Sequence, residues 1–315
     1  MKAVRAHKFG GPEVMTLEEG VERPVPTKCQ VLIRVVAAGI NPIDAIVRSG
    51  SFPQLPKLPF VVGYDGAGLV EAVGAAVTKV KGGAYAEFCV APEGEVFHLP
   101  DNVSFSRGAA LGIPYGTAYR ALFQKGHATV GQTVLVHGAS GAVGLACVQL
   151  AKGAGLRVLG TAGTDQGLQL VKQQGAELVF NHRQEGYAQQ IMAATEGRGV
   201  DVIVEMVASA NLDKDADLLA ERGTVVVVGS KGPGQLDAMK MVLNEACVRA
   251  IALYQYTPRE VAQIGAGLAQ GLRAGFVKPV VGKVYDMAEA AKAHQDLMDP
   301  SKGTAGKLVL KIREE

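Results

Sequence analysis

"VLVHGASGAVGLACVQLAKGAGLRVLGTAG" spans residues 134–163 and places a glycine-rich turn between an apolar strand and a helix of small residues. A second apolar strand follows the helix and ends at residues 161–163. From Ala139 the turn reads A-x-G-x-x-G, in which Gly141 lets the backbone approach a pyrophosphate and Gly144 lets the helix pack on the strand. Free N–H groups at the start of the helix attract an anion. The stretch predicts a dinucleotide-binding turn, with a purely structural tight turn as the alternative.

The alternation of strand and helix continues over residues 130–275. Val- and Ile-rich strands alternate with helical stretches such as PREVAQIGAGLAQGLRAG, a pattern typical of a parallel sheet covered on both faces. Residues 1–118 carry short β-like runs broken by Gly and Pro, and the tail returns to strand, helix, strand. We predict an α/β protein in which a doubly wound parallel sheet, residues 119–278, is inserted into a mostly β domain of residues 1–118 and 279–315.

Composition and charge limit the classes of partner. The chain has 315 residues, a formal net charge of +2 and 48% hydrophobic residues, which predicts globular domains with sizeable cores. This charge is too balanced to attract a nucleic acid or a membrane over long range, and no apolar run reaches the roughly 18 residues of a membrane span. Because the first residues lack the apolar stretch of a secretory signal, we expect a cytoplasmic protein. The four cysteines are scattered and are expected to be small apolar fillers.

The end of the second strand predicts which dinucleotide binds. An NAD-preferring fold carries Asp or Glu about 20 residues past the glycines, whereas this chain has Thr-Ala-Gly at 161–163. His182 and Arg183 end the third strand and Lys231 follows the fifth. Two charge-assisted hydrogen bonds from such groups favour a 2′-phosphate by about a hundredfold or more, so we predict NADPH. Asp165 is the counter-candidate, although an acid at a helix start is more often a cap or dipole partner; His182 and Arg183 are alternatively a solvated loop pair.

Seven stretches carry a resemblance to a known family: GINPIDAIVRSG, GIPYGTAYRAL, VLVHGASGAVG, TAGT, VFNHR, VGSKG and GTAGKLVL. Together they resemble the zeta-crystallin-like quinone oxidoreductases, a branch of the medium-chain dehydrogenase/reductase superfamily, and the similarity covers essentially the whole chain. The resemblance implies a GroES-like catalytic domain built from both chain ends, a Rossmann domain inserted between them, NADPH as cofactor, and a cytosolic homotetramer.

Carried over position by position, the family's cofactor contacts fall on the turn, on the ends of the second and third strands, on the start of a later helix, on the VGSK loop and on the last strand near the nicotinamide. These positions, with the third turn glycine included, are Ser140, Gly141, Ala142, Val143, Gly144, Gly163, His182, Asn211, Val228, Gly229, Ser230, Lys231, Ile251, Ala252 and Leu253.

Zinc alcohol dehydrogenases belong to the same superfamily, so the sequence must also be tested for metal ligands. A catalytic zinc needs thiolate or imidazole ligands, but this chain has Asn41 in GINPID and Tyr64 in GYDGAG. We therefore predict that no metal is bound. Asp44 and Asp65 are expected to be structural hydrogen-bond acceptors rather than catalysts.

The chemistry predicted for a metal-free site is modest. A quinone is a strong electron acceptor, so the protein need only stack it on the nicotinamide, exclude water and offer a donor to the developing oxygen anion. Asn41 is the predicted donor and Thr117 is predicted to hold the nicotinamide amide, with turn and helix-cap roles as their alternatives. The resemblance implies electrons passed singly to ortho-quinones, and the sequence leaves hydride transfer open.

Two departures from the family pattern and three other functions stay open. Ile46 stands where family members carry Tyr, and AVTKVKGGAYAEF lacks about a dozen residues, which amounts to one typical strand and its connection. A missing strand would expose a sheet edge. The alternative functions are an enoyl thioester or enone reductase, binding of AU-rich mRNA, and a structural role as a lens crystallin; no basic stripe with interleaved aromatics supports RNA binding directly.

Overall fold

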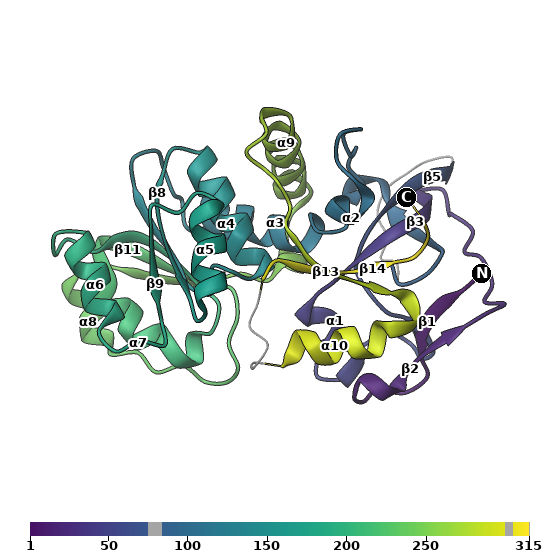
Figure 1. The fold of residues 1–315 in the computed structure, drawn as a ribbon, viewed down its shortest axis with the longest axis horizontal. Helices are drawn as coiled ribbons and strands as arrows, with labels where there is room; N and C mark the ends of the chain where they lie inside the picture. Colours follow the sequence, from purple (N-terminus) through teal and green to yellow (C-terminus); the bar gives the residue numbers. More distant parts are fainter. Residues whose placement is uncertain (75–83, 300–304, 315) are drawn as a thin grey trace. The chain divides into compact units, whose positions relative to one another are not determined.

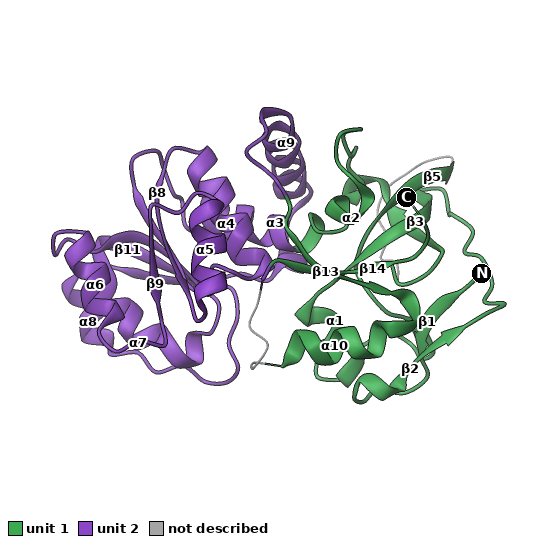
Figure 2. Ribbon diagram, viewed as in Figure 1, with its two compact units in different colours: residues 1–113, 279–302, 306–315 green, residues 114–278, 303–305 purple. Residues whose placement is uncertain are grey.

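Two compact units make up the molecule. The structure is a computed structural model that describes residues 1–74, 84–299 and 305–314. Unit 1 holds Met1–Ile113, Pro279–Lys302 and Gly306–Glu315, and unit 2 holds Pro114–Lys278 and Gly303–Ala305 (Figure 2). The sequence of unit 2 is thus inserted within that of unit 1.

A six-stranded parallel sheet forms the centre of unit 2 (Figure 1). Its order is β12-β11-β10-β7-β8-β9. Successive strands are therefore added on one side of β7 and then on the other side, beginning with β10. Folds of this kind bind ligands at the point between β7 and β10 where the order switches. All four residues of β7 are buried, as expected for a strand covered on both faces. The strands are β7 (Thr133–Val136), β8 (Arg157–Ala162), β9 (Leu178–Asn181), β10 (Val200–Glu205), β11 (Leu219–Val227) and β12 (Cys247–Ala250).

Helices of unit 2 pack along this sheet. Helix α4 contacts β7 and β8, α5 contacts β8 and β9, and α7 contacts β10 and β11. The helices are α4 (Ala142–Gly153), α5 (Asp165–Gln173), α6 (Tyr187–Ala194), α7 (Ala208–Leu218), α8 (Ala238–Leu243) and α9 (Pro258–Ala274), and α3 (Gly112–Tyr119), in which the division between the units falls, continues as a π-helix over Arg120–Lys125. This is the predicted doubly wound sheet, and the fold class is confirmed.

Unit 1 joins both ends of the chain in sheets that are antiparallel except for the parallel pair of β13 and β14. Strand β14 from the tail pairs antiparallel with β3 from the N-terminal part, and β3 also pairs with β5 and β6. A second sheet has the order β2-β1-β4. The strands are β1 (Ala3–Ala6), β2 (Met15–Glu18), β3 (Gln30–Ile40), β4 (Phe60–Val61), β5 (Asp65–Val73), β6 (Phe88–Pro92), β13 (Val281–Asp286) and β14 (Lys307–Lys311), and the helices are α1 (Pro42–Ser49), α2 (Phe105–Gly108) and α10 (Ala290–Met298).

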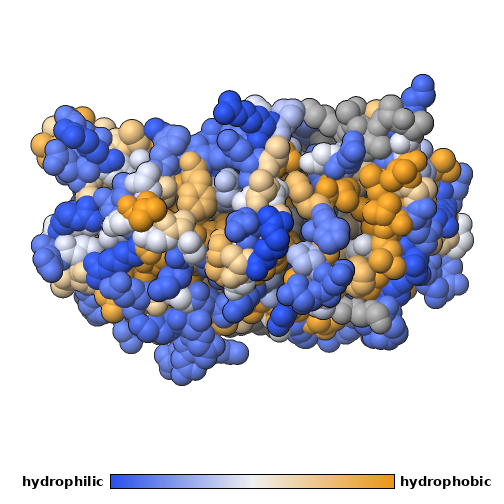
Figure 3. Space-filling model, turned by 90° about the horizontal axis from the view of Figure 1, so that it is seen from above, coloured by the Kyte–Doolittle hydropathy of each residue, from blue (hydrophilic) through white to orange (hydrophobic). Residues whose placement is uncertain are grey.

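Apolar side chains are exposed on unit 1. Leu69, Val70 and Val73 of β5 leave 46%, 54% and 66% of their surface exposed, and Figure 3 shows apolar surface on the side of the molecule where β5 lies. A cavity of about 640 Å³ is lined by residues of β4, β6 and the preceding segments, including Phe60 and Phe88. The shortened stretch falls largely at residues 75–83, which lie outside the described residues, so the expected loss of a strand stays a prediction.

Two expectations about the last strand of unit 2 are wrong. Residues 251–253 lie beyond the strand, because β12 ends at Ala250 and the chain turns into a short 3₁₀ helix at Leu253. Cys247 is exposed rather than a buried filler, since it begins β12, whose outer edge has no neighbour in the described sheet. Among the described residues no helix combines the length and the apolar character needed to cross a membrane.

Candidate functional site

The glycine-rich turn joins β7 to α4 in the predicted conformation. Gly138 has φ +57°, in the left-handed region that favours glycine. A Cβ on Gly144 would lie 2.5 Å from Ala139 Cα, so only glycine allows α4 to pack this close to the turn. Gly141 is the N-cap of α4, without a side-chain cap, and the first turn carries no acidic residue. The first N–H groups of α4 are therefore suited to bind an anion.

Thr161 at the end of β8 connects the turn to the neighbouring strands. Its hydroxyl oxygen accepts a hydrogen bond from Gly138 N–H at 3.2 Å, and its carbonyl accepts one from Ala139 N–H at 2.8 Å. The same hydroxyl lies 3.3 Å from His137 Nδ1 and 3.4 Å from His182 Nδ1. Thr161 is completely buried, so it fixes the turn from within the sheet.

Two basic side chains, and no carboxylate, lie closest to Gly163 on its side-chain face. A Cβ on Gly163 would lie 2.8 Å from both His182 Nε2 and Arg183 Nε, so these nitrogens lie directly over the glycine backbone. His182 and Arg183 are exposed, just after β9. Partial desolvation of the ring, together with the charges of His137 and Arg183, lowers the pKa of His182. Asp165 lies in the first turn of α5, while Thr164 is its N-cap and accepts from Gly167 N–H; Asp165 is thus placed as a dipole partner.

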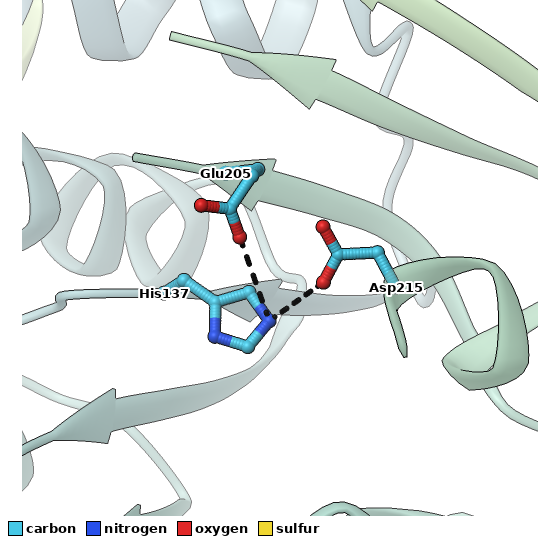
Figure 4. Close-up of side chains that lie close together, drawn as sticks. All are labelled: His137, Glu205 and Asp215. Atoms are coloured by element: carbon cyan, nitrogen blue, oxygen red, sulfur yellow. Dashed lines mark ion pairs between the residues drawn. The ribbon is translucent and has the colours of Figure 1, made fainter. Parts of the chain in front are cut away.

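Three ionisable side chains meet at the carboxyl ends of β7 and β10 (Figure 4). His137 Nε2 lies 3.0 Å from Asp215 Oδ1 and 3.9 Å from Glu205 Oε2, and His137 exposes 3% of its surface and the two acids none. Burial lowers the pKa of His137, but the Asp215 and Glu205 carboxylates outweigh it, so the net pKa is raised. Burial raises the pKa of Glu205 to about 7. Sequence reasoning missed this group, and its sequence signal was the polar residue that ends each of the two apolar strands.

The later cofactor positions surround the same end of the sheet. Asn211 donates to both Glu205 oxygens at 3.2 and 3.1 Å. The VGSK loop, residues 228–231, follows β11 and is tied to α7 because Ser209 N–H donates to Ser230 Oγ at 3.0 Å. Lys231 is exposed. Both positions lie in unit 2, at the carboxyl ends of the strands.

Thr117 lies in α3 close to the segment after β12. It is 94% buried, since 6% of its surface is exposed, and a Cβ on its neighbour Gly116 would lie 3.4 Å from Leu253 Cδ1. Helix α3 is held to α4 by the Tyr115 hydroxyl, which donates to Gln149 Oε1 at 2.6 Å. The structure thus brings Gly116, the neighbour of Thr117 in α3, close to Leu253.

In unit 1, Asn41 belongs to a buried polar cluster with Asp65 and Lys307. Its side-chain amide donates to Asp65 Oδ2 at 3.0 Å and makes a 3.4 Å contact with Gly39 O. Lys307 Nζ donates to Asn41 Oδ1 and, at 3.0 Å, to Asp65 Oδ2. Asn41, Asp65 and Lys307 expose 1%, 6% and 2% of their surface. Because a lysine ammonium already contacts the Asn41 and Asp65 oxygens, these residues do not fit a zinc ion. Lys307 was missed as a site residue.

A second buried cluster in unit 1 lies beneath α1. Asp44 accepts from Asn41 N–H and from the Tyr85 hydroxyl, both at 2.8 Å, so it is an acceptor as expected. The same hydroxyl lies 3.2 Å from His294 Nε2, and Arg48 Nη1 lies 3.2 Å from His294 Nδ1. Burial raises the pKa of Asp44 to about 7. Burial and the Arg48 charge lower the pKa of His294 to about 3.

Two protein families match this chain. The zinc-binding dehydrogenase family matches residues 142–268, and the alcohol dehydrogenase GroES-like domain matches residues 27–84. The quinone oxidoreductase of Lama guanicoe is 43% identical over 99% of this chain and 98% of its own. Those of Sus scrofa and Homo sapiens are 44% and 42% identical, each over 98% of this chain and 97% of their own.

Solved structures agree with these relatives. A mycobacterial protein complexed with NADPH is 32% identical with a TM-score of 0.88, covering 99% of this chain and 100% of its own. The Escherichia coli quinone oxidoreductase complexed with NADPH is 29% identical with a TM-score of 0.86 and the same coverage. The resemblance found in the sequence is confirmed: the chain belongs to the quinone oxidoreductase family, the zeta-crystallin-like branch of the medium-chain dehydrogenase/reductase superfamily.

Proposed function

We propose that this protein is an NADPH-dependent quinone reductase. The observation that carries the proposal is the near-full-length similarity to quinone oxidoreductases. The position of His182 and Arg183 over Gly163, with no carboxylate among these contacts, supports a phosphorylated cofactor. The free N–H groups of α4 and the absence of an acid in its first turn support pyrophosphate binding there.

Each unit has its own part in the proposed reaction. Bound NADPH supplies the electrons. In unit 2, residues 140–144 bind the pyrophosphate, His182, Arg183 and Lys231 bind the 2′-phosphate, and Asn211, Thr117 and residues 251–253 line the rest of the cofactor site. In unit 1, Asn41 donates a hydrogen bond to the quinone oxygen through the amide hydrogen that now makes only the 3.4 Å contact with Gly39 O. Lys307 and Asp65 hold the Asn41 amide in place.

Finer features of the proposal rest on the resemblance. We infer single-electron transfer to ortho-quinones, a homotetramer and a cytoplasmic location. The unpaired outer edge of β12, with Val248 39% exposed, supports assembly because such an edge is available to a second strand. Enone or enoyl thioester reduction, AU-rich mRNA binding and a lens crystallin role gain no support from the described residues and are kept as outcomes of the test.

The test is oxidation of NADPH against a panel of quinones, enones and enoyl thioesters, with NADH as the control cofactor. Ortho-quinones are expected to turn over fastest, with a paramagnetic product if electrons pass singly. NADPH binding without turnover of any quinone would reject the proposal. Faster turnover of an enoyl thioester than of every quinone would replace it.

The 2′-phosphate site has its own test. We expect Arg183→Gln to weaken NADPH binding about tenfold or more, because it removes a charge-assisted hydrogen bond, and to leave the Kd for NADH unchanged. Isothermal titration calorimetry measures both constants. Arg222→Gln is the matched control, since Arg222 is 74% exposed and pairs with Glu245. Equal losses for NADPH and NADH would contradict the assignment.

A further inference from the structure

The buried group of His137, Glu205 and Asp215 is one residue away from the glycine turn, yet none of its side chains is among the proposed cofactor contacts. Both Asp215 oxygens and His137 Nε2 lack an aligned hydrogen bond, so their 3.0 Å contact is an ion pair. A fully buried carboxylate such as that of Asp215 requires a positive charge beside it. An imidazolium at His137 supplies that charge.

The protonation state of His137 decides the direction of two hydrogen bonds, one between His137 and Thr161 and one between Thr161 and His182. As an imidazolium, His137 has a proton on each nitrogen, so Nδ1–H donates to Thr161 Oγ1 at 3.3 Å. Thr161 Oγ1 also accepts from Gly138 N–H at 3.2 Å. A hydroxyl accepts two hydrogen bonds and donates one, so the Thr161 proton is left for His182 Nδ1 at 3.4 Å.

His182 then has a fixed tautomer. Because its Nδ1 accepts from Thr161, the ring proton is on Nε2, and Nε2 is the nitrogen that lies beside Gly163. We propose that His137 is a positioning residue for cofactor choice: held as an imidazolium by Glu205 and Asp215, it acts through Thr161 to keep an N–H of His182 directed toward the proposed site of the adenosine 2′-phosphate. The inference rests on the proposed cofactor site.

We call the hydrogen bonds from His137 through Thr161 to His182 the relay. Its dependence on pH has one direction. The Asp215 and Glu205 carboxylates raise the pKa of His137 above its usual range, which favours the imidazolium. As the pH rises through that pKa, Nδ1 loses its proton and becomes an acceptor, so the Thr161 hydroxyl turns toward His137 and away from His182. The NADPH preference therefore falls at alkaline pH. The charged or titratable groups that face His137 are Glu205 on β10, Asp215 and Lys214 on α7, and His182 after β9.

The tautomer of His182 is the first measurement, made on the cofactor-free protein. Long-range ¹H–¹⁵N spectra distinguish a ring protonated at Nε2 from one protonated at Nδ1, and His182→Gln assigns the signal. We expect the Nε2–H form in the natural protein and in Thr161→Ser, which keeps the hydroxyl, and a mixture in Thr161→Val and His137→Gln. The same tautomer in Thr161→Val as in Thr161→Ser would overturn the relay.

The second measurement is the ratio of the Kd values for NADH and NADPH. Thr161→Val also removes the acceptor of Gly138 N–H and so weakens both cofactors, but only loss of the relay changes their ratio. We expect that ratio to fall about tenfold in Thr161→Val and His137→Gln, and to stay unchanged in Thr161→Ser. Circular dichroism of each variant identifies one that fails to fold. The pH profile of the natural protein then carries the test, and a ratio that stays constant through the titration of His137, followed by nuclear magnetic resonance, would overturn the relay.

The two measurements separate the relay from the proposed site. If the tautomer changes as expected but His182→Gln leaves the ratio unchanged, the 2′-phosphate lies elsewhere, and the proposed site and the role of the relay both fall. If His182→Gln lowers the ratio but Thr161→Val does not, the site stands and the relay is overturned. One equivalent of a divalent metal retained after dialysis and lost in His137→Gln would also overturn it, since the group would then be a metal centre.

Discussion

The two units each bury a charged cluster, but the clusters are balanced differently. In unit 1, the Lys307 ammonium contacts Asp65 Oδ2 at 3.0 Å, one positive charge against one negative charge. In unit 2, His137 lies between two acids, Glu205 and Asp215. The lysine and the carboxylate thus balance each other in charge, whereas a single imidazole, the side chain whose ordinary pKa is nearest to neutral, faces two acids.

This difference indicates different roles for the clusters. The unit 1 cluster joins β14 to β5 and to the start of α1, so it fixes the two chain ends together and holds the Asn41 amide. The unit 2 cluster lies at the point where the sheet order reverses, next to the proposed cofactor turn. We therefore expect the first to determine stability and the second to determine pH dependence.

The largest effect is expected from breaking the unit 1 pair. Lys307→Met removes the ammonium and leaves the Asp65 carboxylate buried without its counter-charge. Removal of one partner of a buried pair costs about 3–5 kcal/mol. Urea unfolding followed by circular dichroism measures the free energy of unfolding. Lys311→Met is the matched control, because Lys311 lies on the same strand and its side chain is 43% exposed.

The outcome for Lys307 is checked by a second variant. If the cost comes from the unpaired carboxylate, Lys307→Met combined with Asp65→Asn regains part of the lost free energy. A Lys307→Met protein as stable as the Lys311→Met protein would show that the pair contributes nothing net, and the contrast between the two units would fail.

A smaller effect is expected from Glu205→Gln. The folded state raises the pKa of Glu205 from 4.5 to about 7, so the fold favours its neutral form. This contribution to the free energy of unfolding is full below pH 4.5 and is lost as the pH rises to about 7. Without the titrating carboxylate, we expect the decrease between pH 4.5 and 7 to be smaller by about 2 kcal/mol.

Asp217→Asn is the control for Glu205, since Asp217 is 59% exposed and pairs with Lys240 on the surface of the same unit. Its curve of unfolding free energy against pH is expected to follow that of the natural protein between pH 4.5 and 7. A Glu205→Gln curve parallel to both would mean that Glu205 does not titrate in that range.

Local patterns were enough to predict much of unit 2. The strands β7 and β10 are rich in Val, Ile and Leu and their residues are almost all buried, and Gly144 of the turn is required by the close approach of the backbone. The end of β12 was not predicted correctly because residues 251–253, which follow the strand, are apolar. Strand β12 ends there because its pairing partner β11 ends at Val227, the residue that pairs with Ala250.

The polar clusters were harder to predict because their members come from distant parts of the chain. Lys307 and Asp65 are separated by 242 positions, and no periodicity in the sequence connects them. His182 was predicted to be a site residue from its charge and its place after a strand. Its partner Thr161 was noted only because no Asp or Glu stands at that position. Its hydroxyl gained a role when the fold placed it between two histidines.

The smallest effect is expected in the natural protein, where only the pH is varied and a buried histidine of unit 1, His294, is compared with one of unit 2, His137. Burial and Arg48 lower the pKa of His294 in unit 1 to about 3, so its stabilising contribution is present above pH 6.5 and is lost as the pH falls toward 3. The net pKa of His137 in unit 2 is raised, so its contribution is full below pH 6.5 and is lost at alkaline pH. In a nuclear magnetic resonance titration of the imidazole Cε1 protons, His294 is expected to stay neutral at pH 5, where His137 is charged. If both rings titrate together near 6.5, neither environment acts on its histidine as the contacts indicate, and the assignment of pH dependence to unit 2 is wrong.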